Sequence, residues 1–180
     1  MTPTPPHGLL LALVGLIALT APTAVPAAHD KPSEAAELAG QIAMHRSRAW
    51  HWQRVLGMRR TPTDFAERTT TSVEALRALR ARWRTRAIDV RSQAKRPPHR
   101  AAWSCIQRHE GRWNDPGAPY YGGLQMDITF QRRYGRYLLR RKGTANRWTR
   151  LEQMWTAEKA LRAGRGFYPW PVAASRCGLI

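Results

Sequence analysis

Apolar side chains between residues 38 and 56 recur three and four positions apart, which is the spacing of one face of an α-helix. Ser33 can cap such a helix, Glu34 and Glu37 suit its first turn, and Gly57 suits its end. The pattern predicts a helix over residues 33–56 that packs one stripe against another element. The stripe comprises Leu38, Ile42, His45, Ala49, Trp52 and Leu56.

A second amphipathic helix is expected after a loop over residues 57–70. Thr71 and Glu74 have the spacing of a capping box, and apolar positions then recur at helical spacing as far as Val90. Two striped helices joined by a loop predict a helical hairpin. The second stripe comprises Leu76, Leu79, Trp83, Ala87 and Val90. The opposite face carries Arg77, Arg80, Arg84 and Arg91, for which a solvated surface is the simplest interpretation.

The character of the chain changes after residues 93–100, where Pro97-Pro98 indicates a linker. Residues 101–180 hold five of the eight Trp, all five Tyr and both Cys. A module of that size has a small core and benefits from a covalent cross-link. We predict a domain over residues 97–180, preceded by a helical hairpin of unknown role over residues 28–96.

Within this domain the pattern predicts a mainly α fold with a short β-hairpin. The first expected elements are a helix over 101–110 that ends at Gly111, a turn over 114–117 and a short strand or hairpin over 120–125. Two helices follow. Asp127 caps the first, which runs through Phe130 and Leu138, and a Thr149–Glu152 capping box opens the second.

The N-terminus has the pattern of a signal peptide. An apolar run over residues 8–19 precedes the first acidic residue, Asp30, and is followed by small residues, with Val25 and Ala27 at the −3 and −1 positions of a cut after Ala27. The run is shorter than the ~20 residues of a membrane span. We expect a signal peptide over 1–27 and a secreted or wall-associated mature chain without a transmembrane span. Because the leading segment lacks Lys and Arg, an uncleaved anchor is the alternative.

The charge and the cysteine content of the chain limit which binding partners and metal sites are expected. Thirty Lys and Arg against twelve Asp and Glu leave a net charge of +18, which favours an anionic partner such as nucleic acid, an acidic membrane surface or an anionic wall polymer. Two cysteines exclude a Cys₄ zinc site, and we predict no metal or cofactor. Export would favour a disulfide between Cys105 and Cys177. No zinc finger or other nucleic-acid motif is present, so specific nucleic-acid binding is not expected.

Glu110 is the candidate for acid–base chemistry. It lies at a predicted helix end, close to Trp113 and shortly before a glycine-rich hairpin. A carboxyl group against a Trp in a partly dry cleft has its neutral form favoured, so its pKa rises and it can act as a general acid. A structural role at the helix end is the alternative. Of the other acidic residues, Asp127 and Glu152 have capping positions, and Glu158 is expected to form a salt bridge or to be solvated.

Five separated motifs resemble the resuscitation-promoting factor domain, the transglycosylase-like branch of the lysozyme superfamily. They are Trp103 to Trp113, Tyr120 to Met126, Gly143-Thr-Ala, Glu152-Gln153 and Trp170-Pro-Val172. The resemblance covers about residues 101–180. It implies a small lysozyme-like fold that acts on peptidoglycan glycan strands, with Glu110 as the catalytic residue. The residues it implies for substrate binding are Trp113, Tyr120, Tyr121, Gly122, Gly123 and Gln125, with Leu124 also lining the cleft.

The chain departs from that family near the catalytic position. The family commonly has cysteines where this chain has His109 and Ala173, and here both are displaced outward by four residues. Four residues make one helical turn, so the displaced pair still predicts a disulfide. His109 and Arg112 also replace small neutral residues, and such cations lower the pKa of a neighbouring carboxyl group. We expect burial of Glu110 to prevail if Arg112 points to solvent.

The expected function is cleavage of the β-1,4 bond between N-acetylmuramic acid and N-acetylglucosamine, with Glu110 as a single general acid and base. A hydrolase would need a second carboxylate, for which Asp115 and Asp127 are the nearby candidates. Without one, a lytic transglycosylase is expected, in which the 6-hydroxyl of the sugar attacks. A non-catalytic wall-binding module is the alternative, and anionic wall polymers are expected partners in both cases.

Overall fold

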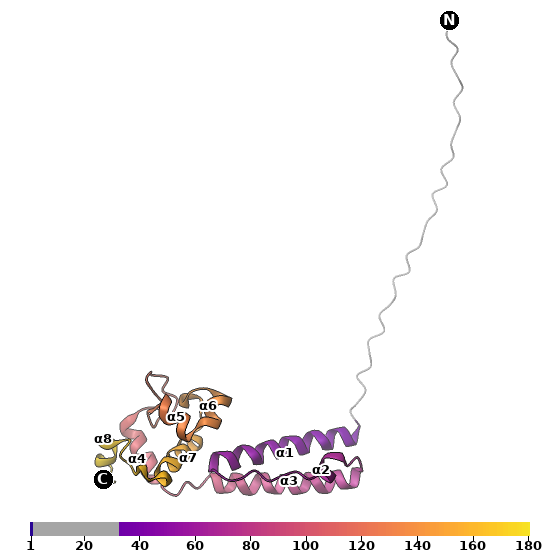
Figure 1. Ribbon diagram of the computed structural model, residues 1–180, viewed down its shortest axis with the longest axis horizontal. Coiled ribbons are helices and arrows are strands. Elements are labelled where there is room, and N and C mark those ends of the chain that lie inside the picture. Colours follow the sequence, from indigo (N-terminus) through magenta and orange to yellow (C-terminus); the bar gives the residue numbers. More distant parts are fainter. Residues whose placement is uncertain (2–32) are drawn as a thin grey trace. The chain divides into compact units, whose positions relative to one another are not determined.

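The computed structural model describes Met1 and residues 33–180, so the predicted signal peptide lies outside the described residues (Figure 1). Residues 33–180 belong to one compact unit, which is mainly helical and contains a two-stranded antiparallel β-hairpin. This confirms the predicted fold class. Over the same residues, none of the helices combines the length and apolar character that crossing a membrane requires.

The predicted helical hairpin is present and consists of α1 (Glu34–Leu56) and α3 (Val73–Ala94), which lie side by side (Figure 1). The Ser33 hydroxyl accepts a hydrogen bond from the Ala36 amide, and Gly57 ends α1 in the left-handed conformation, as expected. Both predicted stripes face each other, although His45 and Trp52 are only partly buried. The seam consists of Leu38, Ile42, Ala49, Leu76, Leu79, Trp83 and Ala87.

Two details of the hairpin differ from the sequence prediction. The expected loop contains a short helix, α2 (Phe65–Thr69), because the Asp64 carboxylate accepts a hydrogen bond from the Glu67 amide and caps it. The residue that caps α3 is Ser72, whose hydroxyl accepts from the Ala75 amide, so the predicted Thr71 cap was wrong by one residue. Neighbouring hydroxyl residues offer equivalent caps, and the register of the apolar stripe selects between them.

The rest of the unit is a compact group of short elements around one core. They are α4 (Arg100–Glu110), β1 (Tyr120–Tyr121), β2 (Met126–Asp127), α5 (Ile128–Tyr134), α6 (Arg136–Lys142), a 3₁₀ turn (Ala145–Arg147), α7 (Arg150–Ala160), a π-helical turn (Leu161–Arg165) and α8 (Pro171–Arg176). The strands pair Tyr120 with Asp127 and Tyr121 with Met126. The capping box of Thr149 and Glu152 is formed as predicted.

The helix expected after Asp127 is divided into α5 and α6 at Gly135. The ring of Trp148 packs directly against Gly135, in the space where a Cβ atom would lie. The indole nitrogen of Trp148 donates to the Gly143 carbonyl, which fixes the ring in that place. Two helices thus replace the predicted one, and they meet at the glycine on which the Trp148 ring packs.

The hairpin and the C-terminal elements share a core. Val55, Leu56, Val90 and Ala94 pack in one cluster with residues of α4 to α8, and Trp52 packs against it. The indole nitrogen of Trp155 donates to the Ala94 carbonyl at 2.8 Å. The predicted linker is therefore short, running from the end of α3 at Ala94 to the start of α4 at Arg100, and Pro97 within it is buried. The division into domains at residues 96 and 97 stays a prediction.

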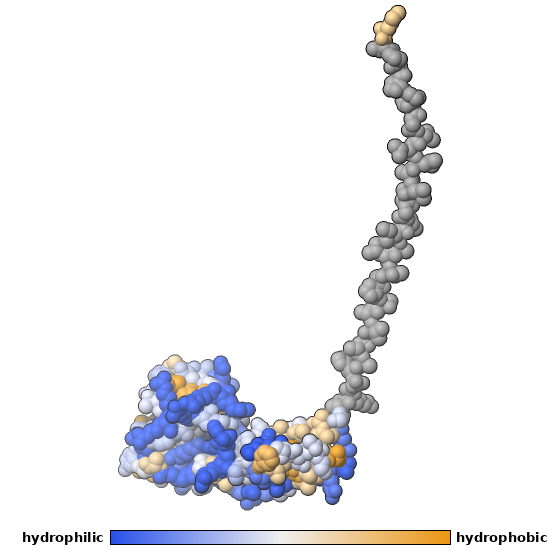
Figure 2. Space-filling model, turned by 45° about the vertical axis from the view of Figure 1, so that its right-hand side comes forward, coloured by the Kyte–Doolittle hydropathy of each residue, from blue (hydrophilic) through white to orange (hydrophobic). Residues whose placement is uncertain are grey.

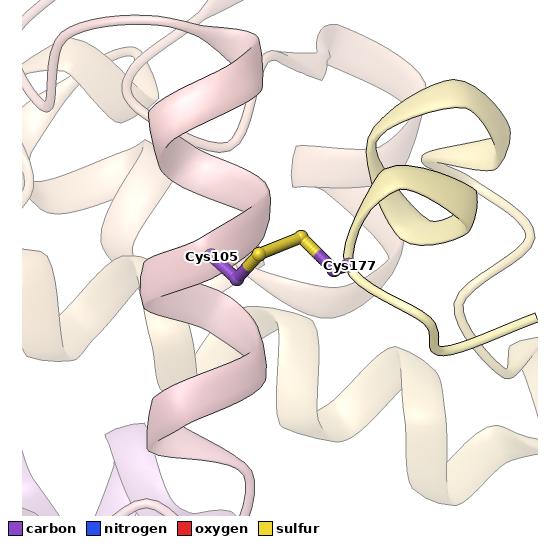
Figure 3. Close-up of a disulfide and its surroundings, with 2 residues drawn as sticks. All are labelled: Cys105 and Cys177. Atoms are coloured by element: carbon purple, nitrogen blue, oxygen red, sulfur yellow. A yellow bond between two sulfur atoms is a disulfide. The ribbon is translucent and has the colours of Figure 1, made fainter.

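A disulfide joins Cys105 of α4 to Cys177, the residue that follows α8 (Figure 3). This confirms the predicted pair. The bridge spans 72 residues, and chain-entropy reasoning gives the closure of such a loop about 4 kcal/mol of stabilisation.

Candidate functional site

Glu110 is the last residue of α4 and is half-buried. The helix ends there because the Gly111 amide donates to the Gln107 carbonyl, and the Gln107 side chain donates in turn to the Gly111 carbonyl at 2.7 Å. Burial raises the pKa of the Glu110 carboxyl above its ordinary value, and the neighbouring His109 charge opposes this shift. Arg112 is exposed, so the net direction agrees with the expectation from the sequence.

Asp115 and Gln125 form a hydrogen-bonded floor next to Gly111, the residue that follows Glu110. The Gln125 amide nitrogen donates to the Asp115 carboxylate at 2.9 Å and to the Gly122 carbonyl at 3.0 Å. A Cβ atom on Gly111 would lie 2.9 Å from that nitrogen and 3.1 Å from the Asp115 oxygen. The glycine therefore allows close packing of this floor against the residue next to Glu110. Gln125, predicted to bind substrate, has its amide nitrogen engaged in this contact.

The two glycines of the β-hairpin are held by Gln153 of α7. Its side-chain oxygen accepts from the Gly123 amide at 2.9 Å, and its nitrogen donates to the Trp113 carbonyl at 2.7 Å. Gly122 has a φ of 75°, and a Cβ atom there would lie 2.6 Å from the Gln153 oxygen. Gly122 and Gly123 thus bring the hairpin backbone against α7, and they are buried.

Gln153 is a positioning residue that the site prediction missed. It is fully buried in α7, where its side chain ties together the hairpin, the Trp113 segment and the 3₁₀ turn. A signal for this role was present, since a glutamine follows the capping Glu152 and precedes the apolar Met154 and Trp155. A polar amide in an apolar stretch indicates a buried group with several hydrogen bonds to make.

The aromatic residues predicted to bind substrate differ in how accessible they are. Tyr120 is 51% exposed, whereas Tyr121 is half-buried and packs against the core. Trp113 is also half-buried, with its ring near Gly123 on one side and the Arg150 guanidinium 6.0 Å from its centroid. Tyr120 is therefore the most accessible of the three aromatic side chains.

A groove of about 530 Å³ is lined in part by residues of α4 and shares Trp113 with the candidate site. Its lining combines basic side chains with Trp113 and with the apolar Leu151 and Met154 of α7. It is lined by Lys95, Arg100, Ser104, Gln107, Arg108, Trp113, Arg150, Leu151 and Met154. Glu110 does not line this groove.

Two carboxylates of residues 101–180 are buried and firmly paired. Glu152 accepts hydrogen bonds from Lys142 at 2.7 Å and lies 2.9 Å from the His51 ring nitrogen. Although burial raises the pKa of Glu152, its hydrogen bonds with His51, Lys142 and Thr149 lower it to about 2. Glu158 accepts from the Trp103 indole at 2.7 Å and also contacts His99, so the predicted ion-pair alternative is present and solvation was wrong.

The two candidates for a second catalytic carboxylate are engaged in turns. Asp127 accepts from the Phe130 amide at 2.6 Å as the cap of α5. Asp115 accepts from the Gly117 amide at 3.0 Å and from Gln125. Among the five acidic residues of 101–180, Glu110 is the one whose carboxyl has no hydrogen-bond partner in the described part of the protein.

Cys105, His109 and Cys177 have donor atoms within 4.8 Å of one another, which is close enough to share a metal ion. Metal-binding cysteines act as thiolates. Because both sulfurs are joined in the disulfide, this cluster offers a single conventional ligand, His109, in the oxidised protein.

Comparisons of the chain with known proteins identified no relative. No family model, curated protein or solved structure matches the chain.

Proposed function

We propose that this protein cleaves peptidoglycan glycan strands, with Glu110 as its single general acid and base. The observation that carries the proposal is the state of Glu110: burial raises its pKa, and it has no hydrogen-bond partner among residues 33–180, whereas the other four acidic residues of the module are paired. A carboxyl group whose neutral form is favoured by burial and that no donor holds is suited to giving and taking a proton. The choice of peptidoglycan as the substrate rests on the motifs that resemble the resuscitation-promoting factor domain.

In the proposed reaction, protonated Glu110 donates its proton to the oxygen that links N-acetylmuramic acid to N-acetylglucosamine. The bond from that oxygen to C1 of N-acetylmuramic acid breaks, and an oxocarbenium-like centre forms. The 6-hydroxyl of the same sugar attacks C1, and ionised Glu110 takes the hydroxyl proton. The products are a 1,6-anhydro end and a new chain end, and Glu110 is protonated again.

The hydrogen bonds of the nearby carboxylates favour a lytic transglycosylase over a hydrolase. An inverting or retaining hydrolase needs a second free carboxylate to activate water or to attack the sugar. Asp115 and Asp127 are the nearby carboxylates, and both are committed to backbone or side-chain donors of the protein. Intramolecular attack requires no second carboxylate.

A non-catalytic wall-binding module is a second candidate, and one observation favours it. The basic groove on α4 includes the aromatic Trp113 but excludes Glu110, so it could hold an anionic glycan without bond cleavage. In both cases we propose that the protein acts outside the cell, at the wall, which is compatible with the disulfide and with the absence of a membrane-spanning helix among residues 33–180.

The two candidates are separated by Glu110→Gln, which preserves size but cannot transfer a proton. We expect release of soluble fragments from purified peptidoglycan to fall by roughly 10²- to 10⁴-fold, because acid–base assistance typically contributes that much. Sedimentation with insoluble peptidoglycan should be unchanged. Glu37→Gln, which alters an exposed carboxylate on α1, is the matched control and should retain full activity. An unaltered rate for Glu110→Gln would show that a different residue is catalytic, and a parent protein that binds peptidoglycan without releasing fragments would favour the binding module.

A further inference from the structure

The helical hairpin carries a groove that the proposed catalytic function does not use. It has a volume of about 540 Å³ and lies along the edge where α1 meets α3. Its lining consists of His45, Arg48, Trp52, Arg84, Ala87, Ile88 and Arg91. The lining thus combines three arginines with an indole ring and aliphatic side chains, and it contains no carboxylate.

The arginines of this groove form no ion pair within the described part of the protein. Elsewhere on the hairpin, Arg77 pairs with Glu34 and Arg82 pairs with Glu67. Among the described residues, no acidic side chain lies within ion-pair distance of Arg48, Arg84 or Arg91. A surface that was only solvated would be expected to mix the two signs of charge, as the rest of the hairpin does.

Arg91 is held in place within the groove. Its guanidinium lies 4.2 Å from the centroid of the Trp52 ring, and one of its terminal nitrogens is buried without a hydrogen-bond partner. A buried donor without a partner is costly, and an anionic oxygen would satisfy it. Burial lowers the pKa of His45, and the charges of the neighbouring Arg48, Arg84 and Arg80 lower it further.

Exposed apolar side chains accompany these charges. Ile88 is 57% exposed and lines the groove, and Met44 on α1, four residues before Arg48, is 40% exposed. Figure 2 shows apolar patches on the hairpin among hydrophilic surface. A phosphate polymer would need the cations alone, whereas a bilayer surface uses cations at its headgroups and apolar side chains just beneath them.

We propose that this edge of the hairpin binds the phosphate headgroups of an anionic phospholipid bilayer, with Arg48, Arg84 and Arg91 contacting phosphate oxygens and Ile88 entering the headgroup boundary. The proposal is independent of the catalytic one, because none of these residues belongs to the site at Glu110. In this proposal, the role of the hairpin is to hold the molecule at the outer surface of a membrane.

The test is co-sedimentation with vesicles of phosphatidylglycerol and phosphatidylcholine, compared with vesicles of phosphatidylcholine alone. The full mature chain should bind only the first kind. The triple change Arg48→Gln, Arg84→Gln and Arg91→Gln should weaken binding roughly 100-fold, since each cation at an anionic surface contributes on the order of fivefold. Because Arg91 packs on Trp52, the double change at the exposed Arg48 and Arg84 is made as well and should weaken binding roughly 25-fold.

The matched control removes the same charge elsewhere, at three exposed arginines that form no ion pair: Arg86→Gln, Arg132→Gln and Arg165→Gln. It should leave vesicle binding within about threefold of the parent, a loss that salt-screened distant charges explain. Equal losses for the control and the groove variants would overturn the proposal, because binding would then follow net charge alone.

Ile88→Ser separates a bilayer from a soluble phosphate polymer. We expect it to weaken binding to phosphatidylglycerol vesicles and to leave binding to soluble polyphosphate unchanged. If Ile88→Ser binds the vesicles as well as the parent does, or if the parent binds polyphosphate but not the vesicles, the edge recognises a polymer and the bilayer proposal is wrong.

Discussion

At the scale of single residues, the chemistry of Glu110 depends on the balance between burial and a neighbouring cation. Burial at the end of α4 disfavours the charged form, and His109 favours it. Arg112, which could have shifted the balance, is exposed. The sequence was sufficient to identify these opposing influences, but the side-chain positions were needed to decide between them.

His109→Gln tests this balance directly. Removing the imidazole removes the influence that lowers the pKa of Glu110, so that pKa should rise further. Because the proposed reaction needs protonated Glu110, the alkaline limb of the pH profile of kcat/KM should move to higher pH. Arg132→Gln, an exposed change on α5, serves as the control. A profile that stays in place or moves to lower pH would show that His109 does not act on the titrating group.

At the scale of elements, the local signals in the sequence were sufficient for most of the fold. Caps and apolar stripes involve residues within a turn or two of each other, so α1, α3 and α7 could be predicted closely. The division of α5 from α6 could not be predicted in this way, because the junction involves the Trp148 ring, which packs against Gly135 from a later segment of the chain. The structural role of Gln153 depends in the same way on contacts between segments far apart in the chain.

The seam of the hairpin gives the second prediction. Trp83 is 2% exposed and meets the Trp50 ring edge-on, with centroids 5.9 Å apart. Trp83→Ala should lower the free energy of unfolding by about 3–5 kcal/mol, because it removes a large buried side chain and leaves a cavity. Denaturant unfolding measures the loss. Phe65→Ala, at a residue that is 73% exposed, should change the stability by less than about 0.5 kcal/mol.

At the scale of the whole molecule, an ion-pair cluster joins the hairpin to the C-terminal elements. His51 of α1 contacts Glu152 of α7 through one ring nitrogen and the Tyr137 hydroxyl of α6, 3.1 Å away, through the other. Lys142 completes the cluster on Glu152. The sequence assigned Glu152 a capping role only, because nothing in the local pattern relates it to a histidine in the first helix.

Glu152 gives the third prediction, which concerns acid stability. Its folded-state pKa of about 2 lies below its ordinary value, so its ionised form stabilises the fold above the unfolded-state pKa. That contribution should be lost progressively as the pH falls from about 4.5 towards 2. Glu152→Gln should lower stability at pH 7 by about 3–5 kcal/mol, since it leaves buried partners unpaired. It should also lose less stability than the parent on acidification. Equal acid sensitivity would contradict the role of the cluster.

The disulfide gives the fourth prediction. Replacing both Cys105 and Cys177 by Ser should lower the free energy of unfolding by about 4 kcal/mol, because the unfolded chain regains the freedom that the 72-residue bridge removes. The parent under reducing conditions should lose a similar amount, and its mass should rise by two hydrogens. Stability that is insensitive to reduction would show that the bridge contributes little.

The central claim is most directly tested by mass spectrometry of the fragments that the mature protein releases from purified peptidoglycan. The proposed single-carboxylate mechanism predicts fragments with 1,6-anhydro-N-acetylmuramic acid ends from the parent and from Glu37→Gln, and a loss of about 10²-fold or more of these fragments with Glu110→Gln. Fragments with only reducing ends would contradict the intramolecular attack, and anhydro fragments released at the parent rate by Glu110→Gln would contradict the assignment of Glu110.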